Sequence, residues 1–110
     1  MTVMHVGDSV VVKSGILDPD FGTDISGWQG RIKEIDNGNT VLISWDSITL
    51  RRMGMETIIR CENENLDWQV MTLEKDDLAL SAARDSEADV DRVASHLSLE
   101  MLGDPRLVDE

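Results

Sequence analysis

The alternation of apolar and polar residues predicts a chain made of several short β-strands. In the segment GDSVVVK, Val10 and Val12 can face a core while the residues next to them face solvent. This two-residue period is typical of a half-buried strand. The segments WQVMTL and LALSA, at residues 68–73 and 78–82, predict two further strands, with EKDD turning between them.

A β-hairpin is predicted where WQGRIKEI and TVLISWD are joined by DNGN. The pair Asn37-Gly38 suits the positive φ angles of a tight turn between two strands. After the turn, Val41, Ile43 and Trp45 alternate and would lie on one face of the second strand.

Two other segments have helical spacing. Met55, Ile58 and Ile59 predict a short helix over residues 54–64. Near the C-terminus, Ser86 followed three residues later by Asp89 resembles a capping box with Asp in place of the usual Glu or Gln. An apolar stripe follows and ends before Gly103 and Pro105; its members are Val90, Val93, Ala94, Leu97 and Met101.

This order of elements predicts a mainly β fold with α additions. We expect a small SH3-like barrel of about five strands, with an inserted short helix and a C-terminal helix. Residues 1–84 would form the acidic SH3-like barrel domain. Residues 85–110 would form the C-terminal helix and tail, packed on the barrel or on a second copy of the chain.

The charge balance then narrows the classes of partner. The chain has 22 Asp and Glu residues against 10 Lys and Arg residues, for a formal net charge of -12. A field of this sign repels nucleic acid and anionic membrane surfaces, and it attracts metal cations and basic proteins. The N-terminal segment lacks the basic and apolar parts of a signal peptide, and no segment is apolar enough to span a bilayer. We therefore expect a cytoplasmic protein.

Catalytic chemistry finds little support in the sequence. Cys61 is the single cysteine, and acidic neighbours should raise its pKa and make it a poor nucleophile. His5 and His96 have no His or Cys at ligand spacing, which argues against zinc. Neither a glycine-rich phosphate loop nor an HExxH helix is present. We expect no enzymatic activity.

The strongest candidate for a site is the segment DPDFGTD within the aperiodic stretch 14–27. Carboxylates at alternate positions can converge on a hard cation such as Ca²⁺ where a glycine lets the chain turn sharply. The segment offers the Thr23 hydroxyl and three carboxylates, Asp18, Asp20 and Asp24, around Gly22. The twelve-residue EF-hand pattern is missing. The alternative is ordinary turn chemistry, because Asp side chains stabilise turns by their own hydrogen bonds.

Other acidic residues are weaker candidates for calcium ligands. Glu62 and Glu64 lie in CENEN, where a solvated helix end is the simpler interpretation, and Asp46 directly follows a predicted strand. The acidic residues at the start of the last helix are expected only to complement the helix dipole. They are Asp85, Glu87, Asp89 and Asp91.

Three of the four aromatic residues are tryptophans. Each could pack in the core or line a groove that binds a peptide. We assign Trp45 to the core. Trp28, at the edge of the acidic loop, is left open between the two roles.

At DPDFGTDISGWQGRI and the following ISWDSITL, the chain resembles the CcbP-type cyanobacterial calcium-binding proteins, which are small, acidic and cytoplasmic. The likeness runs from about Gly7 to the region of Asp77. It implies calcium buffering or signalling through carboxylates outside any EF-hand, and it makes the acidic loop the leading site. The alternative function is an acidic SH3-like interaction module that docks a basic protein partner without a specific ion.

Overall fold

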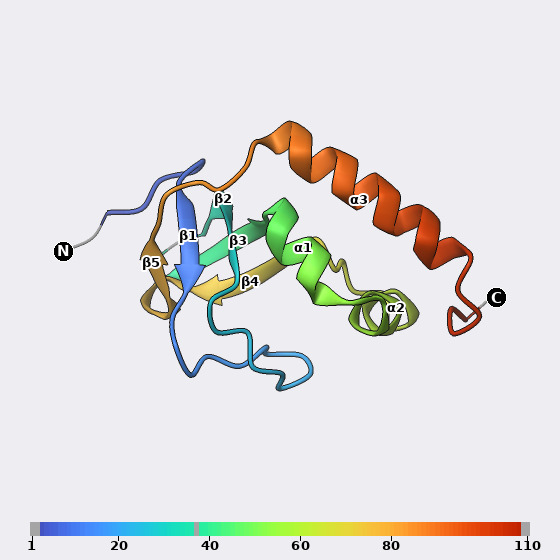
Figure 1. Ribbon diagram of the computed structural model, residues 1–110. Coiled ribbons are helices and arrows are strands. Elements are labelled where there is room, and N and C mark those ends of the chain that lie inside the picture. The colour runs from blue at the N-terminus through green and yellow to red at the C-terminus, as the bar shows by residue number, and fades with distance from the viewer. Residues whose placement is uncertain (1–2, 37, 109–110) are drawn as a thin grey trace.

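Five short strands form one antiparallel sheet in the computed structural model, which describes residues 3–36 and 38–108 (Figure 1). The order of the strands across the sheet is β4-β3-β2-β1-β5, and each neighbouring pair is antiparallel. The strands are β1 (Ser9–Val12), β2 (Gln29–Ile35), β3 (Thr40–Trp45), β4 (Val70–Glu74) and β5 (Leu78–Leu80).

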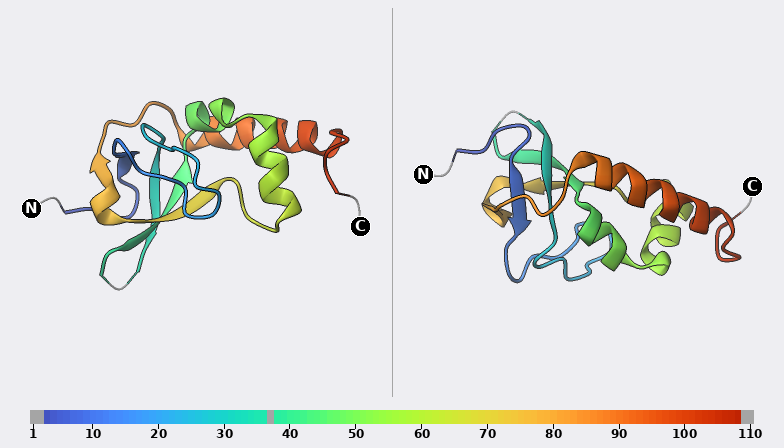
Figure 2. Two further views of the ribbon diagram at one scale, coloured as in Figure 1. Left: turned by 90° about the horizontal axis from the view of Figure 1, so that it is seen from below. Right: turned by 45° about the horizontal axis from the view of Figure 1, so that its top comes forward.

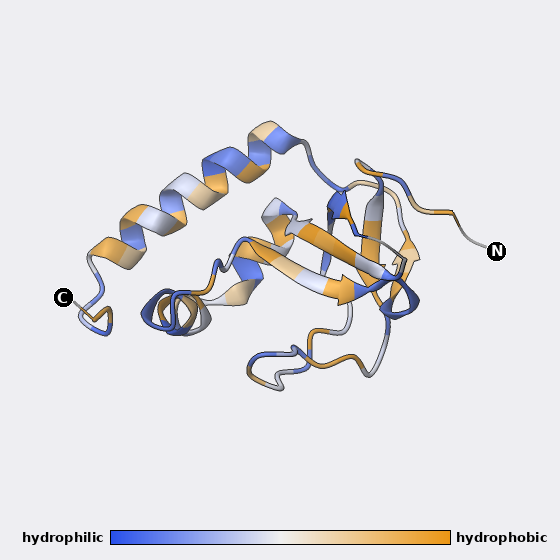
Figure 3. Cartoon of the chain, turned by 180° about the vertical axis from the view of Figure 1, so that it is seen from behind, coloured by the Kyte–Doolittle hydropathy of each residue, from blue (hydrophilic) through white to orange (hydrophobic). Residues whose placement is uncertain are grey.

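The predicted alternation in the strands is confirmed. Val10 and Val12 of β1 are buried while Val11 between them is partly exposed. In β3, the side chains of Val41, Ile43 and Trp45 are all buried, whereas those between them are partly exposed. The buried residues of the strands therefore belong to one core cluster. Figure 3 shows how apolar and polar residues follow one another along the strands.

A glycine allows β2 and β3 to approach closely at the end of their ladder. Gly30 pairs with Trp45, and a Cβ atom at position 30 would lie 2.3 Å from the backbone oxygen of Ser44. No real side chain fits at that distance, so β2 needs a glycine here. At the other end of the hairpin, Gly38 has a φ of 105°, as the tight-turn prediction requires. Asn37, the other residue of that prediction, lies outside the described residues.

Two helices are inserted between β3 and β4: α1 (Ser47–Met53) and α2 (Met55–Asn63). The helix predicted over residues 54–64 is α2, with Ile58 and Ile59 buried as expected. The sequence interpretation missed α1. Its start was recognisable, since Asp46 is the N-cap and accepts a hydrogen bond from the Thr49 backbone N–H at 2.8 Å.

The last helix, α3 (Glu87–Leu102), lies across the inserted helices (Figures 1 and 2). Its predicted capping box is present: Ser86 and Asp89 each accept a backbone hydrogen bond from the other. Val93, Ala94 and Met101 are buried in the core, so the helix packs mainly on α1 and α2. No helix in the described ranges is long and apolar enough to cross a bilayer.

The fold is mixed α/β and not mainly β as expected, because α1 and the sixteen-residue α3 give helices the larger share of the chain. The sheet is also not a closed barrel. Within residues 3–36 and 38–108, the ladders leave β4 and β5 as two separate edges.

Candidate functional site

The acidic stretch between β1 and β2 is a folded loop. Leu17 and Asp24 form an isolated antiparallel bridge at its base. Within it, the Asp18 N–H donates to the Thr23 carbonyl at 2.7 Å, and the Gly22 N–H donates to the Asp18 carbonyl at 2.9 Å. Gly22 has a φ of 72°, a conformation that glycine adopts without strain. The loop therefore has a defined shape before any ligand arrives.

Two side chains, one at the tip of the loop and one near its end, fix it to the rest of the protein. Ile25 is fully buried in the core. The Phe21 ring lies under the guanidinium group of Arg60 from α2, at 4.0 Å from the ring centroid. This cation–π contact brings the tip of the loop to α2, although the two segments are about forty residues apart in sequence.

Asp18 shapes the turn, as the alternative interpretation of the loop requires. Its side chain is buried, and its Oδ1 accepts hydrogen bonds from the backbone N–H groups of Asp20 at 2.7 Å and Phe21 at 3.3 Å. In the described part of the chain, no fully buried side-chain oxygen lacks a hydrogen-bond partner, and no protein donor bonds the Asp18 Oδ2. That second oxygen therefore keeps contact with solvent and can accept from a ligand.

Asp24 and Thr23 lie away from the other predicted ligands of the loop. The Asp24 Oδ1 accepts from the backbone N–H of Ser26 at 2.9 Å and from its hydroxyl at 2.6 Å. These two hydrogen bonds hold the pKa of Asp24 below its usual range. The Thr23 backbone carbonyl accepts from the Asp18 N–H, and Thr23, whose hydroxyl was the predicted ligand, does not line the pocket described below. Of the predicted loop ligands, the structure thus places Asp18 and Asp20 beside one pocket, and Asp24 does not line it.

Asp46 serves as the buried centre of a clamp. Besides capping α1, its carboxylate accepts from Arg84 Nε and Nη2, both at 2.9 Å. Arg84 comes from the segment between β5 and α3 and also reaches the Thr49 hydroxyl. An ion at Asp46 would have to displace this guanidinium, so the prediction of Asp46 as a ligand gains no support from its surroundings.

Asp85 forms a second clamp beside the first, where helix-dipole complementarity was the only role expected. Its carboxylate accepts from the Ser47 N–H at 2.7 Å and from Arg31 Nη2 at 2.8 Å. Burial alone would raise the pKa of Asp85, but hydrogen bonds from Ser47 and Arg31 outweigh it and the pKa is lowered. Arg84 and Asp85 are neighbours in sequence, but each bonds a partner 38 or 54 residues away, so no local pattern predicts either pair.

The acidic loop and the end of α2 meet around Cys61. Burial is the main cause that raises the pKa of the Cys61 thiol to about 11; the negative charges of Asp18, Asp20 and Glu64 contribute to this rise, and Arg60 opposes it. The predicted direction of the Cys61 pKa shift is confirmed. Three of the predicted carboxylates, from two distant segments, therefore act on the Cys61 thiol, and Glu62 is not among them. Glu62 and Glu64 are both exposed, and neither lines the pocket described next.

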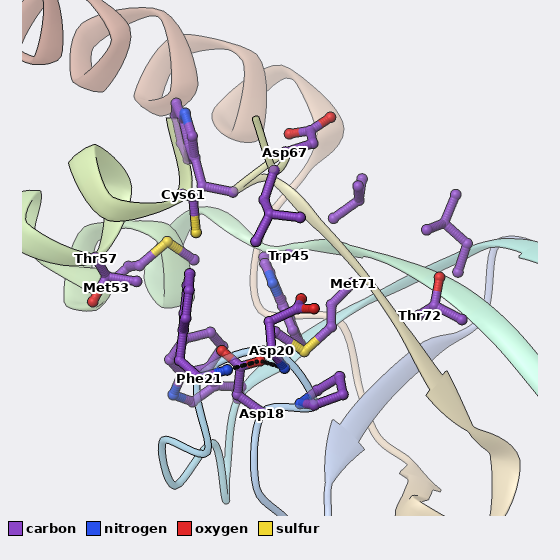
Figure 4. A pocket seen from close by; sticks show the side chains of 16 residues that line it. Asp18, Asp20, Phe21, Trp45, Met53, Thr57, Cys61, Asp67, Met71 and Thr72 are labelled. Carbon is purple, nitrogen blue, oxygen red and sulfur yellow. Dashed lines mark hydrogen bonds between the residues drawn. The ribbon is translucent and has the colours of Figure 1, made fainter. Parts of the chain in front are cut away.

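A pocket of about 330 Å³ lies between the acidic loop, α2 and the β3–β4 edge of the sheet (Figure 4). All three tryptophans line it, and Trp28 packs edge-on against Trp45 with ring centroids 5.2 Å apart. Trp28 packs against the core and lines the pocket, and its role in a groove for a peptide stays a prediction. Its charged lining residues are Asp18, Asp20 and Asp67, of which sequence reasoning missed Asp67.

The donor chemistry at this pocket suits a hard cation, but the ligands are not assembled. Carboxylate oxygens are the ligands that Ca²⁺ prefers. Among the residues that the structure describes, however, no group of three or more His, Cys, Asp or Glu side chains is placed to hold a metal ion. Any ion would have to draw the carboxylates of the loop and α2 together.

No family model, no curated protein and no solved structure matches this chain. The resemblance to the CcbP-type calcium-binding proteins stays a prediction, and the function is argued from the residues around the pocket.

Proposed function

We propose that this chain is a non-EF-hand calcium-binding protein on an SH3-like barrel, and that it buffers calcium or signals its level in the cytoplasm without catalytic activity. The observation that carries the proposal is that Asp18, Asp20 and Glu64, from two segments distant in sequence, all lie near enough to Cys61 for their charges to raise its pKa. These carboxylates repel one another, and a bound cation would remove that repulsion.

The strand order supports the SH3-like barrel. The two edge strands, β4 and β5, are consecutive in the chain and are joined only by the 3₁₀ turn Lys75–Asp77. This turn is bonded to both sides of the sheet: the Lys13 N–H donates to the Asp77 carbonyl at 2.9 Å, and the Lys75 N–H donates to the Asn39 carbonyl at 2.6 Å. A connection this short keeps the end of β4 near the start of β5, as closure of a barrel needs.

The loop geometry suggests how calcium would bind. The Asp18 Oδ2 and the exposed Asp20 carboxylate would supply the calcium ligands from the loop, and Glu64 would supply a ligand from the end of α2. Because these side chains are not yet convergent, binding must restrict their rotamers, which costs free energy. We expect a Kd on the order of 10⁻⁵ M or weaker, beyond the range of tight cytosolic buffers.

Calorimetry on matched charge variants tests the site. Asp20→Asn keeps the shape of the side chain but removes one charge, and it should weaken calcium binding about tenfold, or about 1.4 kcal/mol. Glu87→Gln removes the same charge from the exposed start of α3 and should have little effect at about 0.15 M salt, where distant charges are screened. Equal losses of calcium affinity in the two variants would show that the protein attracts calcium only through its overall negative charge, without a specific site.

Amide NMR locates the ion in the same experiment. Calcium should shift the resonances of residues 18–24 and 60–64, and magnesium should shift them less, because it demands a smaller octahedral site. Shifts confined to α3, or equal responses to the two ions, would contradict the proposed site.

A further inference from the structure

The pocket beside the acidic loop combines an apolar wall with an acidic rim. Trp45 and Trp68 form part of the wall and are held rigidly, since both are buried in the core. Met53 and Met71 add flexible thioether side chains that adapt to the shape of a ligand. The volume of about 330 Å³ is at the small end of the range for ligand pockets, enough for one or two large side chains.

Every charged residue that lines this pocket is acidic. Asp18 and Asp20 come from the loop and Asp67 from the segment before β4 (Figure 4). Arg60, the basic residue beside this site, lies over the Phe21 ring and is absent from the lining. An apolar ligand without charge would leave the rim carboxylates poorly solvated, whereas a ligand cation would form charge-assisted hydrogen bonds with them.

We propose that the pocket binds a segment of a partner protein in which a large apolar side chain stands next to Lys or Arg. The apolar side chain enters the pocket beside the tryptophans, and the neighbouring cation bonds the Asp18 Oδ2 and the Asp20 carboxylate. Phosphate and anionic lipid are repelled by the rim, and a second copy of a chain with a net charge of -12 is repelled as well. Charge complementarity thus selects a basic protein.

This pocket shares Asp18 and Asp20 with the proposed calcium site, so the two ligands should compete. The docking proposal does not depend on calcium, however, because the apolar wall and the rim are present in its absence. Binding is therefore measured in the presence of a chelator, and a failure of calcium binding leaves the docking proposal intact.

Tryptophan fluorescence gives a direct readout, because all three tryptophans line the pocket. The probe is a short capped peptide with one leucine between two arginines, and it should produce a saturable change in the emission. Replacing its leucine by alanine, or its arginines by glutamates, should weaken binding at least about tenfold. Absence of saturable binding by the basic leucine peptide would overturn the proposal, as would equal binding of all three peptides.

Variants of the protein distinguish peptide binding in the pocket from attraction by the overall negative charge. Asp20→Asn should weaken peptide binding about fivefold or more, whereas Asp76→Asn, an equal loss of charge on the exposed 3₁₀ turn, should change it less than about twofold at 0.15 M salt. Thr57→Trp, which places a bulky side chain into the pocket from α2, should abolish binding while the far-UV circular dichroism is unchanged. Equal effects of Asp20→Asn and Asp76→Asn would show that peptides bind only a diffuse acidic surface.

Discussion

The clamp between Asp46 and Arg84 offers the sharpest test of how the C-terminal segment is held on the sheet. Arg84→Ala removes both guanidinium hydrogen bonds from a carboxylate whose side chain is only 5% exposed. Asp46 keeps its bond from the Thr49 N–H, but the oxygen that faced Arg84 Nε loses its partner. A buried charge without its partner is costly in a low-dielectric interior.

The expected loss follows from the burial of the two groups. Removing one partner of a fully buried ion pair costs about 3–5 kcal/mol. The Arg84 side chain is 27% exposed, so water can enter the space that it leaves and solvate Asp46 in part. We therefore expect Arg84→Ala to reduce the free energy of unfolding by about 2–3 kcal/mol.

Urea unfolding followed by tryptophan fluorescence measures this loss. With an m-value of about 1–1.5 kcal/mol/M, the midpoint should fall by roughly 2 M. The control is Arg92→Ala on α3, which breaks an exposed i,i+3 pair with Asp89. That variant should lower the midpoint by about 0.4 M or less, because surface pairs contribute little.

The reasoning fails if both variants shift the midpoint equally, since burial would then not determine the strength of the pair. A double-mutant cycle with Asp46→Ala adds a second check. The coupling energy between Asp46 and Arg84 should exceed about 1 kcal/mol. A coupling energy near zero would mean that Arg84 acts through packing alone.

Two further predictions concern the start and the middle of α3. The lowered pKa of Asp85 means that its contribution to stability is present above the unfolded pKa of about 3.9 and is lost as the pH falls through the folded pKa. Asp85→Asn should therefore lower the urea midpoint at pH 6, and the difference from the wild type should shrink below pH 4; a difference independent of pH would refute this. Leu97→Asp places a charge among side chains packed on the core and should lower the melting temperature, which calorimetry checks; unchanged melting would show that this face of α3 is not tightly packed.

Local patterns in the sequence were enough to predict most of the secondary structure. The alternation around Val10 and Val41 and the capping box at Ser86 involve residues close together in sequence, and the structure confirms each of them. α1 was not predicted because its β-branched residues, Ile48 and Thr49, favour a strand, as the residues before them do. Only the capping Asp before them indicates a helix.

The site was harder to predict because its parts depend on pairings between distant residues. The loop spacing predicted that Asp18, Asp20 and Asp24 converge, but Ser26, two residues further on, holds Asp24 in place. That the loop would meet α2 depends on the contact of Phe21 with Arg60, which no periodic pattern encodes. Long-range partners of single polar side chains are set by the tertiary fold and leave only weak signals in the sequence.

The pairing of β1 with β5 has a consequence for how the chain folds during its synthesis. Val10 lies opposite Leu80, so one edge of β1 finds its partner only after some seventy further residues have left the ribosome. Until then β1 can pair only with β2, and its open edge is available to other nascent chains. Such a long-range closure slows folding relative to the local β2–β3 hairpin. The last strand therefore completes the sheet late, and the ion pairs of Arg84 and Asp85 form later still. A ribosome stalled before residue 80 would expose an aggregation-prone intermediate with an unpaired β1 edge.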